Sequence, residues 1–453
     1  MTNHWKDIKN ADVVLVMGAN PAENHPCGFK WALEARDENG AKLVTIDPRF
    51  TRTSAVADKH LQIRPGSDIA ILGGLIRHIL TNDLHHADYV RAHTNASFIV
   101  SGDFGFEDGL FSGFEEAGSR YDKTSWSYQR AADGYVRRDP TLEDPQCVFQ
   151  LLRRHYDRYT PAMVAQIAGC SEEKFLEMAD IICSTGRADR VGTIMYAVGW
   201  TMHTVGSQII RTGAILQLLL GNIGRPGGGI NALRGHANVQ GATDLGVLAD
   251  TLPGYYGLSA GAWAHWARVW EEDLEWLQSR FSKASFNDTS MMNLTGIPVS
   301  RWIDGVLEDK ENIDQPDNTR AMVLWGHAPN SQTRGTEMKT AMEKLDLMVV
   351  VDPYPTVSAV MQDRTDGVYL LPAATQFETY GSVTASNRSL QWREKVVEPL
   401  FESKTDHEII KLFADKFGFT DKMFRNIEIN GDEPLIEDIT REFNRGMWTI
   451  GYP

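Results

Sequence analysis

Two distant segments of the chain carry the same order of apolar and polar positions. The first begins with the apolar run VVLVM at residues 13–17, continues through a helix-like stretch over 28–36, and reaches a second apolar run that ends in Asp47-Pro48. The second has AMVLW at 321–325, a helix-like stretch over 336–344, and an apolar run that ends in Asp352-Pro353. Continuous apolar strands separated by helices are typical of parallel sheets buried on both faces. The pattern therefore predicts two related α/β units.

The strand ends of these two segments are candidate ligand positions. Gly18 and Gly326 follow the first strand of each segment, and Asp47 and Asp352 follow the second. Ligands of parallel sheets bind beyond the carboxyl ends of the strands. A carboxylate there accepts hydrogen bonds from ribose hydroxyls or a guanine edge, or else caps the turn that follows it. The duplication favours two nucleotide-like ligands, and because no GxGxxG run is present, an ordinary NAD or FAD site is poorly supported.

Further elements fit the same plan. An apolar strand over 192–200 reaches Gly199, and a mostly apolar helix is expected from about 207 to 220. Asp68 would lie at the start of a helix, either as its cap or as a ligand at a basic edge. Thr160 before Pro161 is typical of a helix N-cap followed by proline at the first helical position.

One aromatic-rich segment predicts a helix with a single apolar face. It covers residues 262–281, and its apolar positions are Trp263, Trp266, Trp270, Leu274 and Leu277. The spacing places these side chains on one side of a helix. We expect a packing helix of the core, with a docking surface for a partner as the alternative.

Composition narrows the class of protein. The chain has 453 residues, a length that favours two or three domains. Its formal net charge of −15 argues against a nucleic-acid surface. Its longest apolar runs are too short to cross a bilayer. The four cysteines form no CxxC pair, so the chain shows no iron–sulfur or zinc signature. We expect buried thiols at all four positions, which are Cys27, Cys147, Cys170 and Cys183.

The stretch GRPGGGINALRGHANVQG at 224–241 has the most unusual composition in the chain. Its glycines, at 224–229, could form an anion-binding nest of backbone N–H groups or a helix end followed by a turn. Arg234 presents a planar fork of donors that suits a carboxylate, although an exposed surface arginine is the alternative. His236 could act as a general acid or base, or as a structural residue.

These residues carry a family resemblance. The motifs are MTNHW at 1–5, DIKNAD at 7–12, MGANPAE at 17–23, IDPR at 46–49, the glycine-rich stretch, PA at 372–373, GSV at 381–383 and NR at 387–388. Together they resemble the catalytic α subunit of molybdenum- or tungsten-dependent formate dehydrogenases, which are bis-molybdopterin guanine dinucleotide oxidoreductases. The match covers nearly the whole chain, and the run Arg234-Gly235-His236 is its most specific part.

The resemblance implies a fold and an assignment of residues. It implies an α/β protein of two related αβα domains, 1–235 and an incomplete 236–453, with mainly parallel sheets about a pseudo-twofold and the cofactor between them. Arg234 would hold formate near the metal, His236 would lie beside the substrate, and the loop glycines would pack against the pterin. The residues expected to bind the cofactor are Gly18, Asn20, Glu23, Asp47, Arg49, Gly66, Asp68, Gly199, Gly326, Asn330, Asp352 and Thr356.

The resemblance also implies cofactors and partners. It implies bis-molybdopterin guanine dinucleotide with Mo or W, a [4Fe-4S] cluster, formate as substrate, an iron–sulfur β subunit and a membrane cytochrome subunit, with no nucleic acid. The metal ligand of the family, a selenocysteine or cysteine, and the cluster cysteines have no counterpart in this chain, so no metal ligand is assigned. We expect a fragment produced by a UGA codon read as a stop. Export to the periplasm is expected, with the cytoplasm as the alternative.

Two rival functions stay open from the sequence. One is another oxidoreductase of the same superfamily, such as a nitrate or polysulfide reductase, against which the Arg-Gly-His run argues. The other is a scaffold that binds the cofactor or an electron-transfer partner without chemistry, which the missing metal ligand favours.

Overall fold

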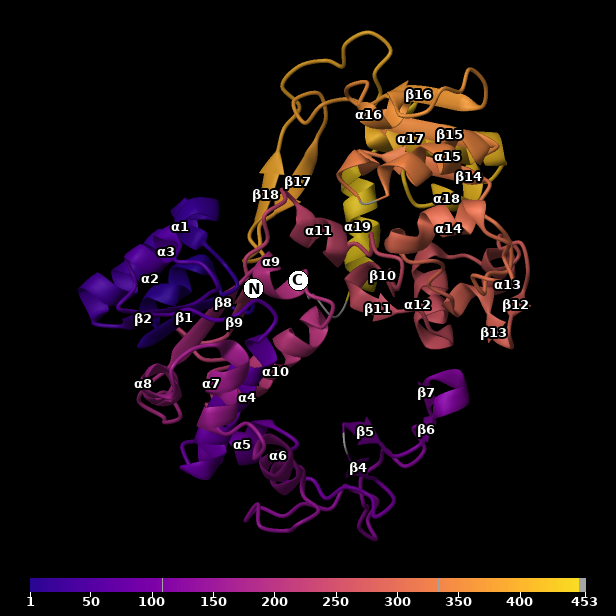
Figure 1. The fold of residues 1–453 in the computed structure, drawn as a ribbon. Coiled ribbons are helices and arrows are strands. Elements are labelled where there is room, and N and C mark those ends of the chain that lie inside the picture. Colours follow the sequence, from indigo (N-terminus) through magenta and orange to yellow (C-terminus); the bar gives the residue numbers. More distant parts are fainter. Residues whose placement is uncertain (108, 333, 448–453) are drawn as a thin grey trace. The chain divides into compact units, whose positions relative to one another are not determined.

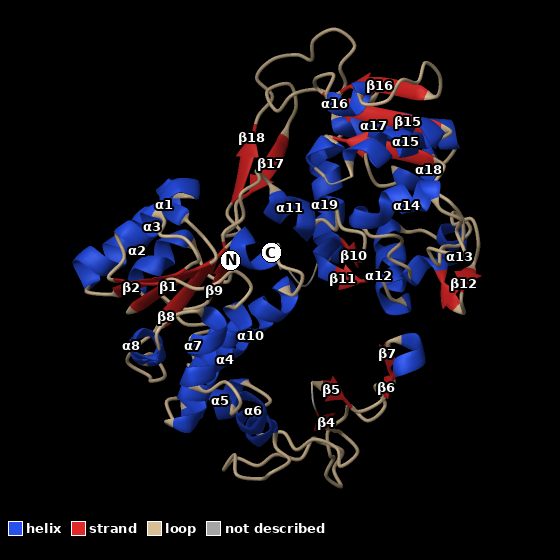
Figure 2. Ribbon diagram, in the orientation of Figure 1, coloured by secondary structure: helices blue, strands red, loops and turns tan. Residues whose placement is uncertain are grey.

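The chain folds into two compact units. The structure is a computed structural model that describes residues 1–107, 109–332 and 334–447. Unit 1 contains Met1–His236 together with Ser386–Arg388, and unit 2 contains Ala237–Ala385 together with the chain from Ser389 onward. Figures 1 and 2 show the elements of each unit.

Unit 1 is built on a five-stranded parallel sheet with the strand order β3-β2-β1-β8-β9. The strands are β1 (Val13–Met17), β2 (Lys42–Ile46), β3 (Lys59–Leu61), β8 (Gly192–Tyr196) and β9 (Ile230–Ala232). The chain first builds outward from β1 to β2 and β3, and later adds β8 and β9 on the other side of β1. The strand order therefore reverses between β1 and β8, which is the topological switch point where ligands of such sheets bind.

Both faces of this sheet are covered by helices. Val13, Leu15 and Met17 of β1 belong to a core formed with one set of helices, whereas Val14 and Val16 belong to a core on the opposite face. The first core uses α4 (Asp68–Thr81), α6 (Val148–Tyr156), α7 (Pro161–Ala168), α8 (Glu172–Cys183) and α10 (Gly206–Leu219), and the second uses α2 (Pro26–Asn39) and the 3-10 helix η1 (Trp5–Asn10). Successive side chains of a strand point to opposite faces of the sheet. Because both faces of β1 are buried, every position in it is apolar, which explains the unbroken apolar run in the sequence.

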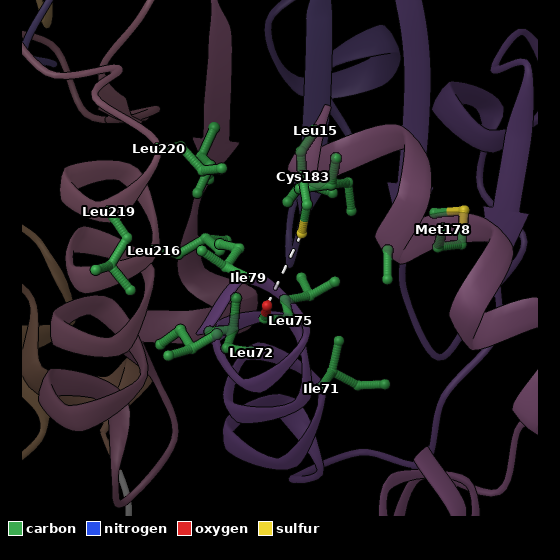
Figure 3. Close-up of a cluster of buried hydrophobic side chains, with 14 of the residues drawn as sticks. Leu15, Ile71, Leu72, Leu75, Ile79, Met178, Cys183, Leu216, Leu219 and Leu220 are labelled. Carbon is green, nitrogen blue, oxygen red and sulfur yellow. Dashed lines mark hydrogen bonds between the residues drawn. The ribbon is translucent and has the colours of Figure 1, made fainter. Parts of the chain in front are cut away.

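Helix α4 is the centre of the larger core. Four of its side chains are fully buried: Ile71, Leu72, Leu75 and Ile79. Figure 3 shows them among leucines of α10. The thiol of Cys183 donates to the backbone oxygen of Leu75 at 3.8 Å. A helix that is apolar on every side is stable only when it is buried on every side, which agrees with the position of α4 between α6, α7, α8 and α10.

The other elements of unit 1 are short. They are α1 (Pro21–Asn24), α3 (Arg52–Ala55), α5 (Ala87–His93), α9 (Val198–Thr201), the 3-10 helix η2 (Glu116–Gly118), and the hairpin strands β4 (Phe106–Glu107), β5 (Leu110–Phe111), β6 (Phe114–Glu115) and β7 (Arg120–Tyr121).

Unit 2 repeats the beginning of unit 1. Its parallel strands are β14 (Ala321–Trp325), β15 (Leu347–Asp352) and β16 (Val368–Pro372), in the order β14-β15-β16. Met348 and Val350 of β15 pack toward α14 (Trp302–Leu307) and α15 (Gly335–Lys344), whereas Val349 and Val351 pack toward α17 (Asp406–Phe417). In both units a short helix follows the second strand, α3 in unit 1 and α16 (Val357–Val360) in unit 2. The predicted repeat of strand, helix, strand and Asp-Pro is confirmed.

The rest of unit 2 consists of short helices and hairpins. The helices are α11 (Val239–Asp244), α12 (Ala260–Trp270), α13 (Leu274–Gln278), α18 (Thr420–Met423) and α19 (Ile436–Gly446), with the 3-10 helices η3 (Pro253–Tyr255), η4 (Met291–Asn293), η5 (Val299–Arg301) and η6 (Pro329–Ser331). The hairpin strands are β10 (Thr251–Leu252), β11 (Tyr256–Gly257), β12 (Ser285–Phe286), β13 (Thr289–Ser290), β17 (Gly381–Thr384), β18 (Leu390–Arg393), β19 (Ile429–Asn430) and β20 (Glu433–Pro434).

Two expectations from the sequence are wrong. The single helix expected over 262–281 is two helices, because the chain turns at Glu271, whose φ is 55°. Trp266 is fully buried as expected, but Leu274 is 37% exposed. The four cysteines are not all buried, since Cys27 is exposed and Cys170 is half-buried.

The helix start expected at Thr160 and Pro161 is confirmed. The Thr160 hydroxyl accepts from the Met163 N–H at 3.2 Å and Pro161 begins α7. Within the described ranges, no helix has both the length and the apolar character needed to span a membrane.

Replacing Leu75 by alanine tests the central position of α4. Because this side chain is fully buried among apolar neighbours, we expect the free energy of unfolding to fall by about 2–5 kcal/mol. Urea denaturation followed by circular dichroism measures the change. The matched control is Leu110→Ala, at a leucine that is 47% exposed, where we expect a change within about 0.5 kcal/mol. Equal losses in the two variants would contradict this account of the core.

Candidate functional site

The carboxyl edge of the unit 1 sheet gathers polar residues from five strands. Gly18 follows β1, Asp47 follows β2 and Arg234 follows β9, while Asp68 begins the helix reached from β3. The strand expected over 192–200 ends earlier, at Tyr196, so Gly199 reaches this edge from α9, three residues after β8. Because all five strands are parallel, these positions lie along the same edge. The predicted placement of Gly18 and Asp47 at strand ends is confirmed.

The switch point between β1 and β8 brings two backbones into close contact. The backbone oxygen of Gly18, whose φ is 66°, accepts from the N–H of Gly199 at 3.0 Å and of Ala197 at 3.3 Å. A Cβ at Gly199 would lie 2.5 Å from that oxygen, so a side chain does not fit there. Behind this contact Trp200 is fully buried and stacks on Tyr196 with ring centroids 4.9 Å apart.

Asp47 and Asp352 make the same hydrogen bond in the two units. Each carboxylate accepts from the backbone N–H two residues further on, Arg49 at 2.9 Å and Tyr354 at 3.2 Å. Capping of the following turn, the simpler of the two interpretations, is therefore present at both positions. Within the described residues, the second oxygen of each carboxylate accepts no hydrogen bond, so capping leaves an acceptor for a ligand.

Asp68 is a buried carboxylate. It is the first residue of α4 rather than its cap, because Ser67 holds the cap position, so the capping alternative is wrong. Burial raises the pKa of Asp68 and the nearby Asp47 adds to the rise, while His203, whose Nε2 lies 4.0 Å from the carboxylate, opposes it. Two carboxylates, Asp47 and Asp68, thus lie at one edge and favour a ligand that brings hydrogen-bond donors.

The side chains of Asn20 and Glu23 are bonded to the protein itself. The Asn20 amide oxygen accepts from the backbone N–H of Thr53 at 3.2 Å and from its hydroxyl at 2.8 Å. The Asn20 amide donates to Glu23, which also pairs with Arg52 at 3.3 Å. These bonds join the turn after β1 to α3, so both residues have a structural role whether or not a ligand is bound.

Arg49 and Gly66 are exposed positions at the same edge. Gly66 has a φ of 85° and no atom lies within 4 Å of where its Cβ would be. The turn before α4 therefore offers an open backbone surface at Gly66, which agrees with its expected role in close approach to a ligand.

Arg234 is half-buried and lies two residues beyond the end of β9. Its backbone oxygen accepts from His25 Nε2 at 3.0 Å and from the Ser386 hydroxyl at 3.4 Å. Burial raises the pKa of Tyr196, and the positive charge of Arg234 offsets part of that rise. Arg234 therefore presents its charge at the sheet edge from an anchored backbone. His236, two residues on, is exposed.

The glycine-rich loop binds an anion of the chain itself. The N–H of Gly227 donates to the carboxylate of Asp7 at 2.9 Å, and the N–H of Gly229 donates to the Asn222 backbone oxygen at 2.9 Å. Burial alone would raise the pKa of Asp7, but hydrogen bonds from Asn3, Gly227 and Asn10 outweigh it and hold the pKa below its ordinary value. The turn interpretation is therefore correct, and these N–H groups do not form a nest for an external anion.

Close contacts explain two of the loop glycines. A Cβ at Gly229 would lie 2.1 Å from the Thr2 hydroxyl, and one at Gly227 would lie 2.5 Å from the Asn10 backbone. Both glycines thus pack against the N-terminal segment of the chain rather than against space for a pterin. Arg225, in the same loop, donates to the backbone oxygens of Arg187, Ala188 and Gly221.

Unit 2 has a corresponding set of residues after β14 and β15. Gly326 is exposed with a φ of 59°, and its N–H donates to the Val351 oxygen at 2.8 Å. Asn330 is exposed in η6. Thr356 precedes α16, and its hydroxyl oxygen is buried with no hydrogen-bond partner in the described residues. Thr356 and Asp352 therefore offer polar atoms that the protein leaves available.

Three residues of this edge were not expected from the sequence. His25, Trp200 and His203 belong to no motif that signals chemistry. Each reaches the site through a contact with a distant segment: His25 with Arg234, Trp200 with Gly18, and His203 with Asp68. In the part of the chain that the structure describes, no group of three His, Cys, Asp or Glu residues could hold a metal ion.

Comparison with known proteins gives a family. The model of the family described as molybdopterin oxidoreductase matches residues 1–416. The chain is 40% identical over 476 residues to the "Formate dehydrogenase, nitrate-inducible, major subunit" of Escherichia coli (strain K12), which covers 96% of this chain and 46% of that protein. It is also 40% identical over 431 residues to "Formate dehydrogenase 2 subunit alpha (cytochrome c-553)" of Nitratidesulfovibrio vulgaris, covering 88% and 42%.

A solved structure shares the fold. The acetylene hydratase of Pelobacter acetylenicus superposes with a TM-score of 0.56 at 17% identity, covering 92% of this chain and 50% of that one. The chain spans about half the length of the curated relatives it matches. The match of the family model over most of the chain, together with the parallel sheets, shows that the chain belongs to the molybdopterin oxidoreductase family.

Proposed function

We propose that this chain is the central part of a formate dehydrogenase catalytic subunit, which oxidises formate to carbon dioxide. The observation that carries the proposal is the run Arg234-Gly235-His236, which begins two residues beyond β9 at the carboxyl edge of the sheet. The 40% identity to formate dehydrogenase major and alpha subunits supports it. The activity belongs to the intact subunit, of which these residues form about half.

The residues at the two strand edges fit a bis-molybdopterin guanine dinucleotide. A guanosine brings N–H and O–H donors, which match the acceptors of Asp47 and Asp68 in unit 1 and of Asp352 and Thr356 in unit 2. The indole of Trp200 lies close enough to Asp68 to favour its carboxylate form, so it supports this acceptor from below the switch point. When bound, the cofactor with its molybdenum or tungsten supplies the two-electron redox chemistry.

Arg234 binds and orients the substrate in this proposal. A guanidinium holds a carboxylate through two parallel hydrogen bonds, which fixes the orientation of formate and neutralises its charge. The hydrogen bond from His25 to the Arg234 backbone oxygen limits the movement of the residue that carries this guanidinium. His236 lies two residues further and holds or releases a proton near the substrate.

Electrons leave the site through an iron–sulfur cluster of the intact subunit to an iron–sulfur β subunit, with a membrane cytochrome subunit as a further partner. The rival functions are another oxidoreductase of the family, of the nitrate or polysulfide reductase type, and a scaffold without chemistry. Formate-dependent reduction of a viologen dye by the intact subunit distinguishes them. Nitrate or polysulfide reduction without formate oxidation would favour the first rival, and the absence of all three activities in a cofactor-loaded subunit would favour the second.

Substitution of Arg234 tests the assignment of the substrate-binding residue. In the full-length subunit, we expect Arg234→Lys to lower kcat/KM for formate by about 10²–10³, because lysine keeps the charge but loses the planar fork. Stopped-flow or steady-state dye reduction measures the change.

The control for this experiment is Arg225→Lys in the same loop. Among the described residues, Arg225 donates to backbone oxygens and to no side chain, so we expect a loss of stability but no comparable loss of turnover per folded, cofactor-loaded enzyme. Undiminished turnover in Arg234→Lys would contradict the proposed role.

Substitution of Asp68 separates stability from ligand binding. A carboxyl with a raised pKa binds its proton more tightly in the folded chain, so its ionisation above that pKa lowers stability. We expect Asp68→Asn to raise the free energy of unfolding at pH 7 by about 0.5–2 kcal/mol. The gain should vanish as the pH falls below the ordinary pKa of aspartate, about 3.9. The same variant should bind guanosine diphosphate more weakly by calorimetry.

Asp47→Asn is the matched control, because an asparagine oxygen still accepts from the Arg49 N–H. We expect weaker nucleotide binding without a gain in stability. A stability gain in Asp68→Asn that does not change with pH would contradict the ionised, buried carboxylate.

A further inference from the structure

A cavity of about 730 Å³ lies in unit 1, away from the strand edges described above. One wall is α6, which contributes Arg154 and His155, with Arg158 just beyond the helix. The other wall is the aromatic arm, defined here as residues 98–130, which includes the hairpin strands β4 to β7 (Figure 1). None of the residues that line the cavity belongs to the candidate cofactor site, so the cavity needs an explanation of its own.

The wall formed by the arm consists mainly of aromatic rings. The ring of Phe111 lies 4.7 Å from that of Phe106 and 5.1 Å from that of Trp126. Phe106 in turn meets His155 of α6 edge-on at 4.9 Å. Phe111, Trp126 and Tyr128 are 37–40% exposed, although each lines the cavity. The rings are thus in contact with one another but stay partly exposed toward the cavity, which leaves apolar surface for a ligand to cover.

Among the described residues that line the cavity, the charged side chains that are always cationic are Arg154 and Arg158, and none is an aspartate or glutamate. The whole chain, by contrast, carries a net charge of −15. Each arginine uses one donor on a backbone oxygen, Arg154 on Pro145 at 2.8 Å and Arg158 on His155 at 3.1 Å. Within the described residues neither forms an ion pair with a carboxylate. Their remaining N–H groups are therefore available to an anion.

A polar atom inside the cavity wall also lacks a partner. The Nδ1 of His155 is buried and makes no hydrogen bond in the described residues. A buried polar atom of this kind lowers stability unless a ligand or water supplies the missing bond. The cavity thus combines flat apolar walls, two guanidinium groups and one unsatisfied imidazole nitrogen.

We propose that this cavity binds a small amphipathic organic anion, with an aromatic or medium-chain apolar group between the rings and a carboxylate or sulfonate at Arg154 and Arg158. The volume lies in the range of pockets that hold drug-sized ligands, about 300–1,000 Å³. An apolar body with an acidic end matches both the rings and the charges, whereas a cation or a purely polar anion matches only one of them or neither. The proposal does not depend on the reaction of the enzyme.

Two fluorescent probes test the proposal, because they differ only in charge. 8-Anilinonaphthalene-1-sulfonate carries a sulfonate, and N-phenyl-1-naphthylamine is the same ring system without it. We expect Arg154→Gln combined with Arg158→Gln to weaken binding of the sulfonate probe by about 10- to 100-fold, the loss expected for hydrogen bonds to a charged group. Binding of the neutral probe should be unchanged. Trp126→Ala should weaken both, and octanoate should displace the sulfonate probe from the unmodified protein.

The matched control is Arg153→Gln on the same helix, because Arg153 pairs with Asp83 at 2.8 Å and does not line the cavity. This variant should bind both probes as the unmodified protein does. Unchanged binding of the sulfonate probe in the double variant would overturn the proposal. Equal loss of both probes in that variant would overturn it as well, because the arginines would then shape the cavity rather than recognise an anion.

Discussion

The candidate cofactor site depends on one backbone contact. Gly18 follows β1 and Gly199 lies in α9, just after the neighbouring strand β8, and the Gly18 oxygen accepts the Gly199 N–H at 3.0 Å with no space for a Cβ at Gly199. From this contact the chain turns to opposite sides of the sheet, from β1 toward β2 and from β8 toward β9. Asp47 and Asp68 therefore come to one side and Arg234 to the other. A bulkier residue at Gly199 would separate the groups that the proposed function needs together.

Much of the framework could be predicted from the sequence because it depends on local patterns. The runs at 13–17 and 321–325 are apolar without a break because both faces of each strand are covered, and such runs have few other interpretations. The expected helix over 262–281 failed for a tertiary reason. At Glu271 the chain leaves the helix, and the next residue, Glu272, is nearly buried between Lys422 and Arg425. Neither partner lies near it in the sequence.

The site itself was only partly predictable. Positions at strand ends follow from parallel topology, so Asp47 and Asp352 could be found without a structure. The hydrogen bonds and ion contacts of the site residues could not be predicted, because they form only in the folded chain. Examples are the Asx turn at Asp47, the hydrogen bond from His25 to the Arg234 backbone and the approach of His203 to Asp68. The glycine-rich loop shows the same limit. Its expected anion is present, but it is Asp7, about 220 residues earlier in the chain.

The most direct test of the account is an experimental structure of the intact subunit with its cofactor bound. The account predicts that one guanosine lies beyond the carboxyl ends of β1, β2 and β3, within hydrogen-bond distance of Asp47 or Asp68, and the other beyond β14 and β15, at Asp352 or Thr356. A substrate analogue should contact the guanidinium of Arg234. Guanosines bound at the amino ends of these strands, or a substrate held away from Arg234, would contradict it.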